Sequence, residues 1–263
     1  MPTQTFIYDE LICSSAEVLR LKLSAALSVS GLLIIKGFPR DDDELMAFAS
    51  HFGGPELVYP PQFRAKCYPH VRIQSNIPGI GVSGGGEYWH SDGPWSATPS
   101  SATLLLCFEA SEITGSTHFV DMRDVYSGLP QETQRELKSR IGLYPCRSIY
   151  ENELALLGLA DPEKLTELRD LTHPLVRKHP TTGQQALYLN EKWLTAIADT
   201  TESESRALMD RLYGAVAAHS SLYVHRWNAG DLLVWDNVSM IHKARPTPVG
   251  SVKITHRVTI AGV

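Results

Sequence analysis

Several stretches of the chain place apolar residues three or four positions apart among polar ones, which is typical of helices. These stretches are residues 15–30, 130–141 and 200–219. A further helix is predicted to begin at Asp42 or Asp43 and to end at Gly53-Gly54, because acidic residues favour helix starts and glycines favour helix ends.

Short apolar or alternating stretches, bounded by turn-forming residues, predict strands. They cover residues 31–38, 70–76, 88–95, 101–110, 223–227, 232–237, 239–246 and 251–260. Residues 173–190 predict a hairpin that turns at the sequence PTTGQ. The pattern therefore favours a mixed α+β fold that is mainly β, with an antiparallel barrel flanked by helices.

The chain has no internal repeat and no evident linker, and its 263 residues suit one large domain. We therefore expect a single domain over residues 1–263. Residues 146–172 are polar and helix-prone, and they separate strand-like segments. They are interpreted either as a lid insertion that keeps water from a site or as a peripheral helix.

Composition narrows the class of protein. The formal net charge is -5 and no long basic run occurs, so neither a nucleic-acid groove nor a polybasic membrane surface is indicated. The four cysteines are far apart and form no CxxC pair, which favours reduced thiols in a cytoplasmic protein. The most apolar early run is too short to span a bilayer. We expect a small-molecule partner, and self-association into a homo-oligomer stays open.

Two familiar motifs carry little weight here. The glycines of GIGVSG, at residues 79–84, match G-x-G-x-x-G, but the following residues lack helical periodicity. We therefore interpret this segment as a loop beside a site. The chain has no G-x-S-x-G elbow, and no cysteine stands out as an activated nucleophile.

The sequence EYWHSDGPW raises the question of a metal site. If residues 88–95 form a strand, His90 and Asp92 project from the same face. A third ligand must come from elsewhere, and His242 is the best of several histidines because it follows a strongly apolar strand–turn–strand. Two histidines and one carboxylate form the facial triad of non-haem Fe(II) oxygenases.

The final predicted strand carries two cations. At strand spacing Lys253 and Arg257 share one face with two threonines. If that face points inward, these charges imply an anionic partner, because an unpaired buried cation is costly. The alternative is an edge strand with both side chains in water.

Five ordered blocks give the chain a family resemblance. They are GLLIIKGFP, WHSDGPW, TGSTHFVDM, HPLVRKHPTTGQQALYLN and YVHRWNAGDLLVWDNVSMIH. With them the chain resembles the TauD/TfdA family of Fe(II)- and 2-oxoglutarate-dependent dioxygenases. The resemblance implies a double-stranded β-helix (jelly-roll) barrel flanked by helices.

The resemblance also implies roles for single residues. His90, Asp92 and His242 would bind iron, and Thr117 would hydrogen-bond 2-oxoglutarate. Arg257 matches the family's terminal arginine, whereas Lys253 stands where the family usually has a second arginine. Because lysine cannot form a bidentate fork, either Lys253 or Arg257 would hold the distal carboxylate of 2-oxoglutarate.

The expected function is oxidation of an unactivated C–H bond in a small polar metabolite, with hydroxylation as the expected outcome. Fe(II) would be the metal, and 2-oxoglutarate and O2 the cosubstrates, with release of succinate and CO2. Alternatives are a cupin-type isomerase or lyase without 2-oxoglutarate, and a non-catalytic ligand-binding barrel. The candidate substrate residues, which would otherwise only pack, are Glu87, Tyr88, Trp95 and Trp193.

Overall fold

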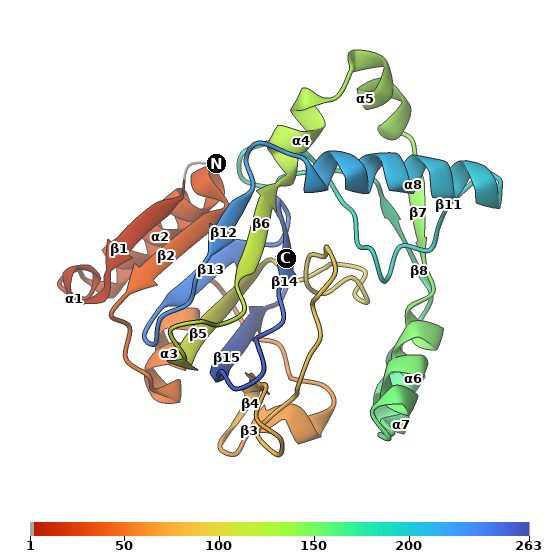
Figure 1. The fold of residues 1–263 in the computed structure, drawn as a ribbon. Coiled ribbons are helices and arrows are strands. Elements are labelled where there is room, and N and C mark those ends of the chain that lie inside the picture. Colours follow the sequence, from red (N-terminus) through yellow and green to blue (C-terminus); the bar gives the residue numbers. More distant parts are fainter. Residues whose placement is uncertain (1–2, 263) are drawn as a thin grey trace.

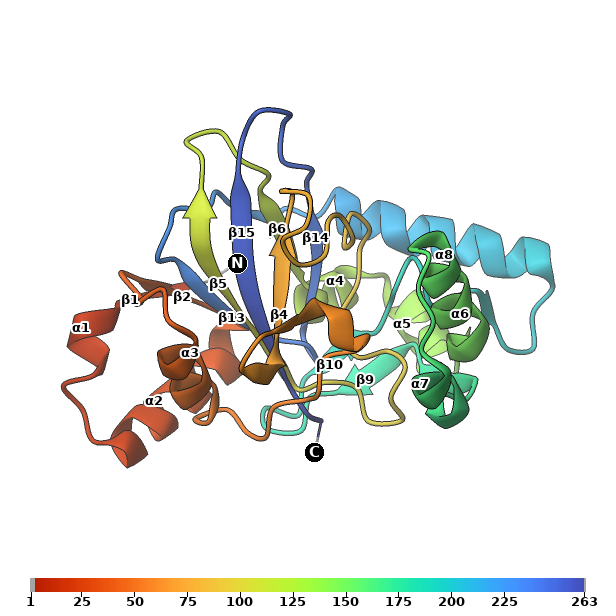
Figure 2. The same ribbon diagram turned by 90° about the horizontal axis from the view of Figure 1, so that it is seen from below.

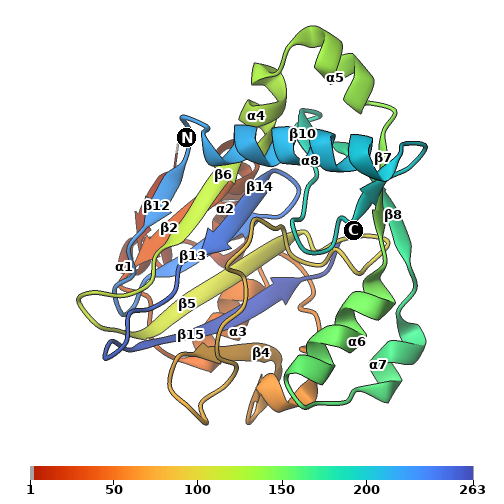
Figure 3. The same ribbon diagram turned by 45° about the vertical axis from the view of Figure 1, so that its right-hand side comes forward.

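The computed structural model of the chain describes residues 3–262, and its largest unit is a seven-stranded sheet (Figure 1). Across this sheet the strands are β1 (Gln4–Ile7), β2 (Leu32–Lys36), β13 (Leu232–Asp236), β5 (Ala102–Ala110), β15 (Lys253–Ile260), β4 (Tyr68–Ser75) and β3 (Arg64–Ala65). A second sheet has the order β12 (Tyr223–His225), β6 (Thr117–Asp121) and β14 (Met240–Ala244). It crosses in front of the larger sheet in Figure 3.

Two smaller sheets and the helices complete the molecule. The smaller sheets are β11 (Ala196–Ile197), β7 (Ile141–Tyr144) and β8 (Leu171–Pro174), and the pair β9 (Val176–Lys178) and β10 (Gln185–Leu187). The α-helices are α1 (Tyr8–Leu11), α2 (Ala16–Ser30), α3 (Asp42–Ala49), α4 (Met122–Gly128), α5 (Gln131–Leu137), α6 (Cys146–Leu156), α7 (Pro162–Glu167) and α8 (Glu202–Ala217), and a 3-10 turn covers Pro61–Phe63. Among the described helices, none has both the length and the apolar character needed to cross a bilayer.

Strand β2 shows why the central strands are continuous apolar runs. Leu33 and Ile35 pack in the core that α2 and α3 share with the large sheet. Leu32 and Ile34 instead belong to the core between the two sheets. Both faces of the strand are therefore buried, and no polar alternation is needed. Figure 2 shows α2 and α3 on one side of the large sheet and α6, α7 and α8 on the other.

The prediction of a mixed fold with many strands and flanking helices is confirmed, but the fold is not mainly β, because the helices hold slightly more residues than the strands, and no closed barrel forms in the described part of the chain. Within residues 3–262 the large sheet keeps two open edges, β1 and β3, and β1 pairs with β2 in parallel. Strand β3, at one of these edges, has only two residues. The facing sheets bury each other without closure.

Most helix and hairpin predictions are confirmed by the structure. Helix α2 begins after Ser15, whose side chain accepts a hydrogen bond from the backbone of Val18. The hairpin in residues 173–190 is the antiparallel pair β9–β10. Helix α3 begins at Asp42, one of the two predicted starts, after the capping residue Asp41, whose side chain accepts from the Glu44 amide. It ends at Ala49, before the predicted stop at Gly53-Gly54.

Helix α8 offers a test of a purely local interaction. Its capping box pairs the Thr201 hydroxyl with the Glu204 amide and the Glu204 carboxylate with the Thr201 amide. Thr201→Ala should lower the free energy of unfolding by about 1 kcal/mol. Thermal or chemical unfolding measures this, with the exposed loop variant Thr181→Ala as the control. Equal stabilities of the two variants would show that the box contributes nothing.

Candidate functional site

A backbone bridge to strand β14 brings two histidines, His90 and His242, together. The His90 amide donates to the His242 carbonyl at 3.0 Å, and the His242 amide donates to the His90 carbonyl at 2.8 Å. Strand β14 positions His242, and the bridge places the two ring centroids 4.0 Å apart. Residues far apart in the sequence therefore present their imidazoles side by side.

The predicted strand over residues 88–95 is wrong. His90 makes only an isolated bridge, and the segment otherwise has no regular structure. Gly93 adopts a φ of 75°, and a Cβ atom there would collide with Ser100. Pro94 follows and has no amide to donate to a strand.

The two-residue spacing nevertheless brings a carboxylate to the histidine pair. Donor atoms of His90, Asp92 and His242 all lie within 4.8 Å of one another, and the three side chains are buried. The closest approach of His242 Nε2 to Asp92 Oδ2 is 4.0 Å. The structure thus brings together the three residues that the sequence predicts as a metal site.

The Asp92 carboxylate is held by Thr103 and Asn237, which the sequence reasoning did not identify, and by Arg257, which it assigned to 2-oxoglutarate instead. Thr103 donates to Asp92 Oδ2 at 2.7 Å, and Arg257 donates to Asp92 Oδ1 at 3.0 Å. The Asp92 amide donates to Asn237 Oδ1 at 3.1 Å, and Asn237 in turn donates to Thr103. These bonds fix the orientation of the carboxylate before any ligand arrives. Of the two residues that were missed, Asn237 had a sequence signal in its position within the WDN block, and Thr103 had none.

The protonation states suit metal binding. Burial lowers the pKa of His90, and burial together with the neighbouring His90 lowers the pKa of His242 well below its ordinary value, so both imidazoles are neutral at pH 7. Burial alone would raise the pKa of Asp92, but Arg257, the two neighbouring imidazoles and the hydrogen bond from Thr103 together lower it and keep the carboxylate ionised.

The orientation of the rings fits the same purpose. His90 Nδ1 lies 2.8 Å from the Tyr88 carbonyl, an arrangement in which Nδ1 carries the proton and Nε2 is left as a lone-pair donor. His242 Nδ1 is buried and has no hydrogen-bond partner within residues 3–262. Two neutral imidazoles and one carboxylate, without a thiolate, are a donor set that suits Fe(II).

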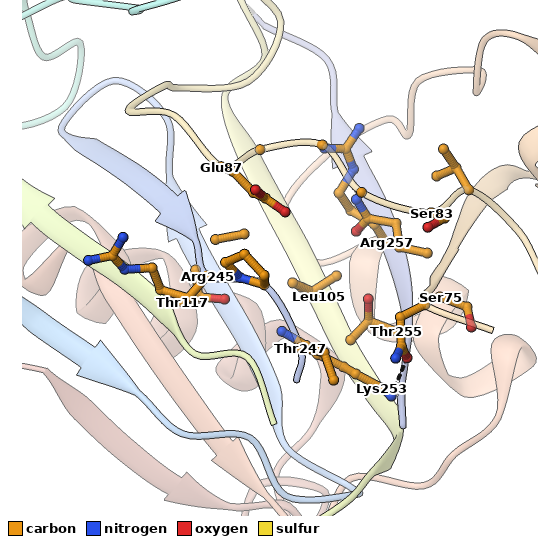
Figure 4. Close-up of a pocket in the computed structure, with 18 of the residues that line it drawn as sticks. Ser75, Ser83, Glu87, Leu105, Thr117, Arg245, Thr247, Lys253, Thr255 and Arg257 are labelled. Carbon is orange, nitrogen blue, oxygen red and sulfur yellow. Dashed lines mark hydrogen bonds between the residues drawn. The ribbon is translucent and has the colours of Figure 1, made fainter. Parts of the chain in front are cut away.

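A cavity of about 270 Å³ lies on one side of this cluster (Figure 4). Lys253, Thr255 and Arg257 line it from β15, and Thr117 lines it from β6 in the second sheet. The face of the final strand that carries Lys253 and Arg257 therefore points inward. This is the first of the two predicted alternatives, and the edge strand with both side chains in water is not observed. Glu87, a predicted substrate residue, also lines this smaller cavity and is largely exposed.

Trp227 connects the two predicted cosubstrate residues and was not identified from the sequence. Its indole Nε1 donates to Thr117 Oγ1 at 3.0 Å, so the threonine hydroxyl can direct its own hydrogen into the cavity. The Lys253 ammonium lies 4.9 Å from the Trp227 ring centroid. Lys253 Nζ also donates to the Gly115 carbonyl at 2.8 Å, which leaves two of its three donors for a ligand.

A larger cavity of about 740 Å³ lies on the other side of the cluster. Three predicted substrate residues, Tyr88, Trp95 and Trp193, line it, and the last two pack with ring centroids 5.2 Å apart. The larger cavity does not include Glu87 among its lining residues. Both cavities share His90 and Arg257, so they meet at the histidine–carboxylate cluster.

The glycine-rich loop forms part of the wall between the cavities. Gly84, Gly85 and Gly86 line both of them, each with a φ in the left-handed region. A Cβ at Gly86 would lie 3.2 Å from the His90 ring, which explains a glycine there. No helix begins at this loop, so the dinucleotide interpretation is excluded and the loop lies beside the site as predicted.

Comparisons with known proteins agree with this geometry. The family model "Taurine catabolism dioxygenase TauD, TfdA family" matches residues 2–259. The alpha-ketoglutarate-dependent 2,4-dichlorophenoxyacetate dioxygenase of Cupriavidus pinatubonensis is 26% identical over 258 residues, which cover 90% of this chain and 87% of that protein. Pentalenolactone F synthase of Streptomyces arenae is 28% identical over 237 residues, which cover 83% of this chain and 78% of that protein.

A solved structure extends the agreement to the fold. The crystal structure of AAD-2 in complex with Mn(II) and N-oxalylglycine superposes with a TM-score of 0.76 at 25% identity, covering 94% of this chain and 88% of that one. Since the family model spans nearly the whole sequence, the chain belongs to the TauD/TfdA family and is a 2-oxoglutarate-dependent dioxygenase that uses Fe(II), 2-oxoglutarate and O2.

Proposed function

We propose that this enzyme hydroxylates an unactivated C–H bond of a small molecule bound in the larger cavity and releases succinate and CO2. The observation that carries this proposal is the meeting of two cavities at the buried His90, Asp92 and His242 cluster. One cavity is lined by cations suited to a dicarboxylate, and the other is lined by aromatic side chains, Tyr88, Trp95 and Trp193 among them, together with charged ones. The cluster can thus contact both molecules at once.

The residues divide the work as follows. His90, Asp92 and His242 hold Fe(II), which when bound with 2-oxoglutarate supplies the activation of O2. Thr117 and Lys253 hold the distal carboxylate of 2-oxoglutarate in the smaller cavity. Arg257 holds the Asp92 carboxylate in place and lies at the boundary of the two cavities. This division assigns the clamp to Lys253, since Arg257 already has a partner.

The architecture supports the assignments made from the resemblance. We infer that the two facing sheets form the double-stranded β-helix of the family, opened at its edges, within one domain over residues 1–263. Helices α6 and α7 contribute Tyr150, Leu154 and Lys164 to the wall of the larger cavity, and we assign residues 146–172 as its lid. The four free cysteines support a cytoplasmic location.

A substrate screen under 18O2 tests the proposed reaction. Each compound is incubated with the Fe(II)-loaded enzyme and 2-oxoglutarate, and succinate and product mass are measured. The proposal requires at least one compound whose product gains a single 18O atom in step with succinate. Conversion of a compound without succinate formation would instead indicate a metal-dependent isomerase or lyase.

Lys253 gives the cosubstrate site a specific pH dependence. Burial lowers the pKa of Lys253 from 10.5 to about 8. The ammonium is protonated below this pH and loses its proton above it. Binding of 2-oxoglutarate should therefore weaken by about tenfold per pH unit above pH 8.

Calorimetric titrations with 2-oxoglutarate between pH 6.5 and 9.5 measure this dependence. The variant Lys253→Arg should bind with little change over the range, because arginine stays protonated. The same decline in wild type and Lys253→Arg would assign the pH dependence to another group.

A further inference from the structure

Arg72 is a cation in the larger cavity that none of the roles above uses. It lies in the middle of β4, where alternate residues His70, Arg72 and Gln74 line the larger cavity. Val71, between them, is fully buried in the core on the other face. The strand alternation therefore aims the Arg72 side chain at the space assigned to the substrate.

The Arg72 guanidinium has no counter-ion in the described part of the chain. It forms no ion pair there, and its Nε atom is buried without a hydrogen-bond partner. The neighbouring Arg257, by contrast, is paired with Asp92. Burial, and next the charge of Arg257, lower the pKa of Arg72 from 12.5 to about 9, so the side chain still carries its charge at pH 7.

The strand register makes the unpaired charge of Arg72 more unfavourable. Arg72 and Arg257 are direct cross-strand partners in the β4–β15 pair. Like charges opposite each other across a sheet destabilise it. The Arg72 guanidinium does lie 5.0 Å from the Phe63 ring centroid, but one cation–π contact does not replace an anion for a partly buried charge.

The acidic residues that line the same cavity are already engaged. Glu56 accepts from Ser100 at 2.8 Å, and Asp92 is held by Thr103 and Arg257. The other two pair with lysines, Glu153 with Lys192 and Glu167 with Lys164. None of these carboxylates forms an ion pair with Arg72, so a bound anion would supply its missing counter-charge.

We propose that Arg72 binds a carboxylate of the substrate and is the residue that selects for acidic substrates. This inference rests on the proposed function, because it takes the larger cavity as the substrate site. A carboxylate at Arg72 would supply its missing counter-charge and match the donor fork of its guanidinium. The aromatic lining, which includes Tyr88, Trp95 and Trp193, would enclose the apolar part of the same molecule.

Binding of matched acids and alcohols tests the proposal. The probes are phenoxyacetate against phenoxyethanol, phenylacetate against phenethyl alcohol, and benzoate against benzyl alcohol. Binding is measured by calorimetry on the full chain without oxygen, both with and without Fe(II) and 2-oxoglutarate. In wild type at least one acid should bind more than about tenfold tighter than its alcohol, as a charge-assisted hydrogen-bonded contact implies.

The variants identify the residue responsible. Arg72→Gln should remove the preference for the acid and leave the affinity for the alcohol unchanged, whereas Arg72→Lys should keep part of the preference. Arg135→Gln, on the exposed face of α5, should bind as the wild type does. The proposal is overturned if no acid binds the wild type more tightly than its alcohol, or if Arg72→Gln keeps the preference.

Stability provides a second measurement that needs no ligand. An unpaired arginine that binds a ligand should destabilise the fold when no ligand is bound. Arg72→Met should therefore raise the Tm by about 2 to 4 °C. A fall in Tm would show that the charge supports the fold and would overturn the proposal. Because binding and Tm do not depend on turnover, a protein that prefers acids but forms no succinate would contradict the proposed function alone.

Discussion

His90→Ala is expected to lose stoichiometric Fe(II) binding and to form succinate at least about 1000-fold more slowly than the wild type, a loss of roughly 4 kcal/mol of transition-state stabilisation. The reason is that, among residues 3–262, three protein donors converge at the site, and each is buried. Removing one leaves Asp92 and His242 to hold the metal alone. Metal analysis after desalting, together with a succinate assay, measures both effects.

A matched control separates loss of the ligand from loss of the fold. His219 lies at the end of α8 away from the cluster and hydrogen-bonds Ser221, so His219→Ala should keep Fe(II) binding and activity. Asp92→Ala should behave as His90→Ala does. Near wild-type metal content in either ligand variant would remove that residue from the site.

The second large effect is expected at the cosubstrate clamp. Lys253→Ala should raise the KM for 2-oxoglutarate by about 10- to 100-fold, the cost of one charged hydrogen-bonded contact. The kcat should change much less, because Lys253 lies outside the histidine–carboxylate cluster. Initial rates at varied 2-oxoglutarate concentration give both constants.

Comparison with two other variants makes this result specific. Lys253→Arg should restore most of the affinity, because it keeps the positive charge. Arg257→Ala should instead disturb Asp92, its hydrogen-bond partner, and lower kcat. An unchanged KM in Lys253→Ala, with a large rise in Arg257→Ala, would move the clamp to Arg257.

The sequence predicts those parts of the fold that local burial determines. Residues 31–38 and 101–110 are continuous apolar runs, and both became central strands because both of their faces are buried. Residues 88–95 have strand-like composition but pair with β14 only at His90. Whether such a segment finds a hydrogen-bonding partner depends on the tertiary arrangement, which no local pattern contains.

In the site, too, some residues can be predicted from the sequence, whereas others depend on the tertiary arrangement. His90, Asp92 and His242 could be predicted because ligand chemistry limits the residue types and the family blocks mark their positions. Arg72 could not, because its significance comes from the register that places it opposite Arg257 and from the absence of a described counter-ion. The support of Thr117 by Trp227 likewise depends on contacts between distant strands.

The central claim is that the His90, Asp92 and His242 cluster holds Fe(II) and that 2-oxoglutarate binds this iron. The most direct measurement is visible absorption under anaerobic conditions as 2-oxoglutarate is added to the Fe(II)-loaded protein. The account predicts a weak charge-transfer band that saturates at one 2-oxoglutarate per chain and is missing in His90→Ala. The lack of any such band in the wild type, or a band of equal strength in His90→Ala, would contradict it.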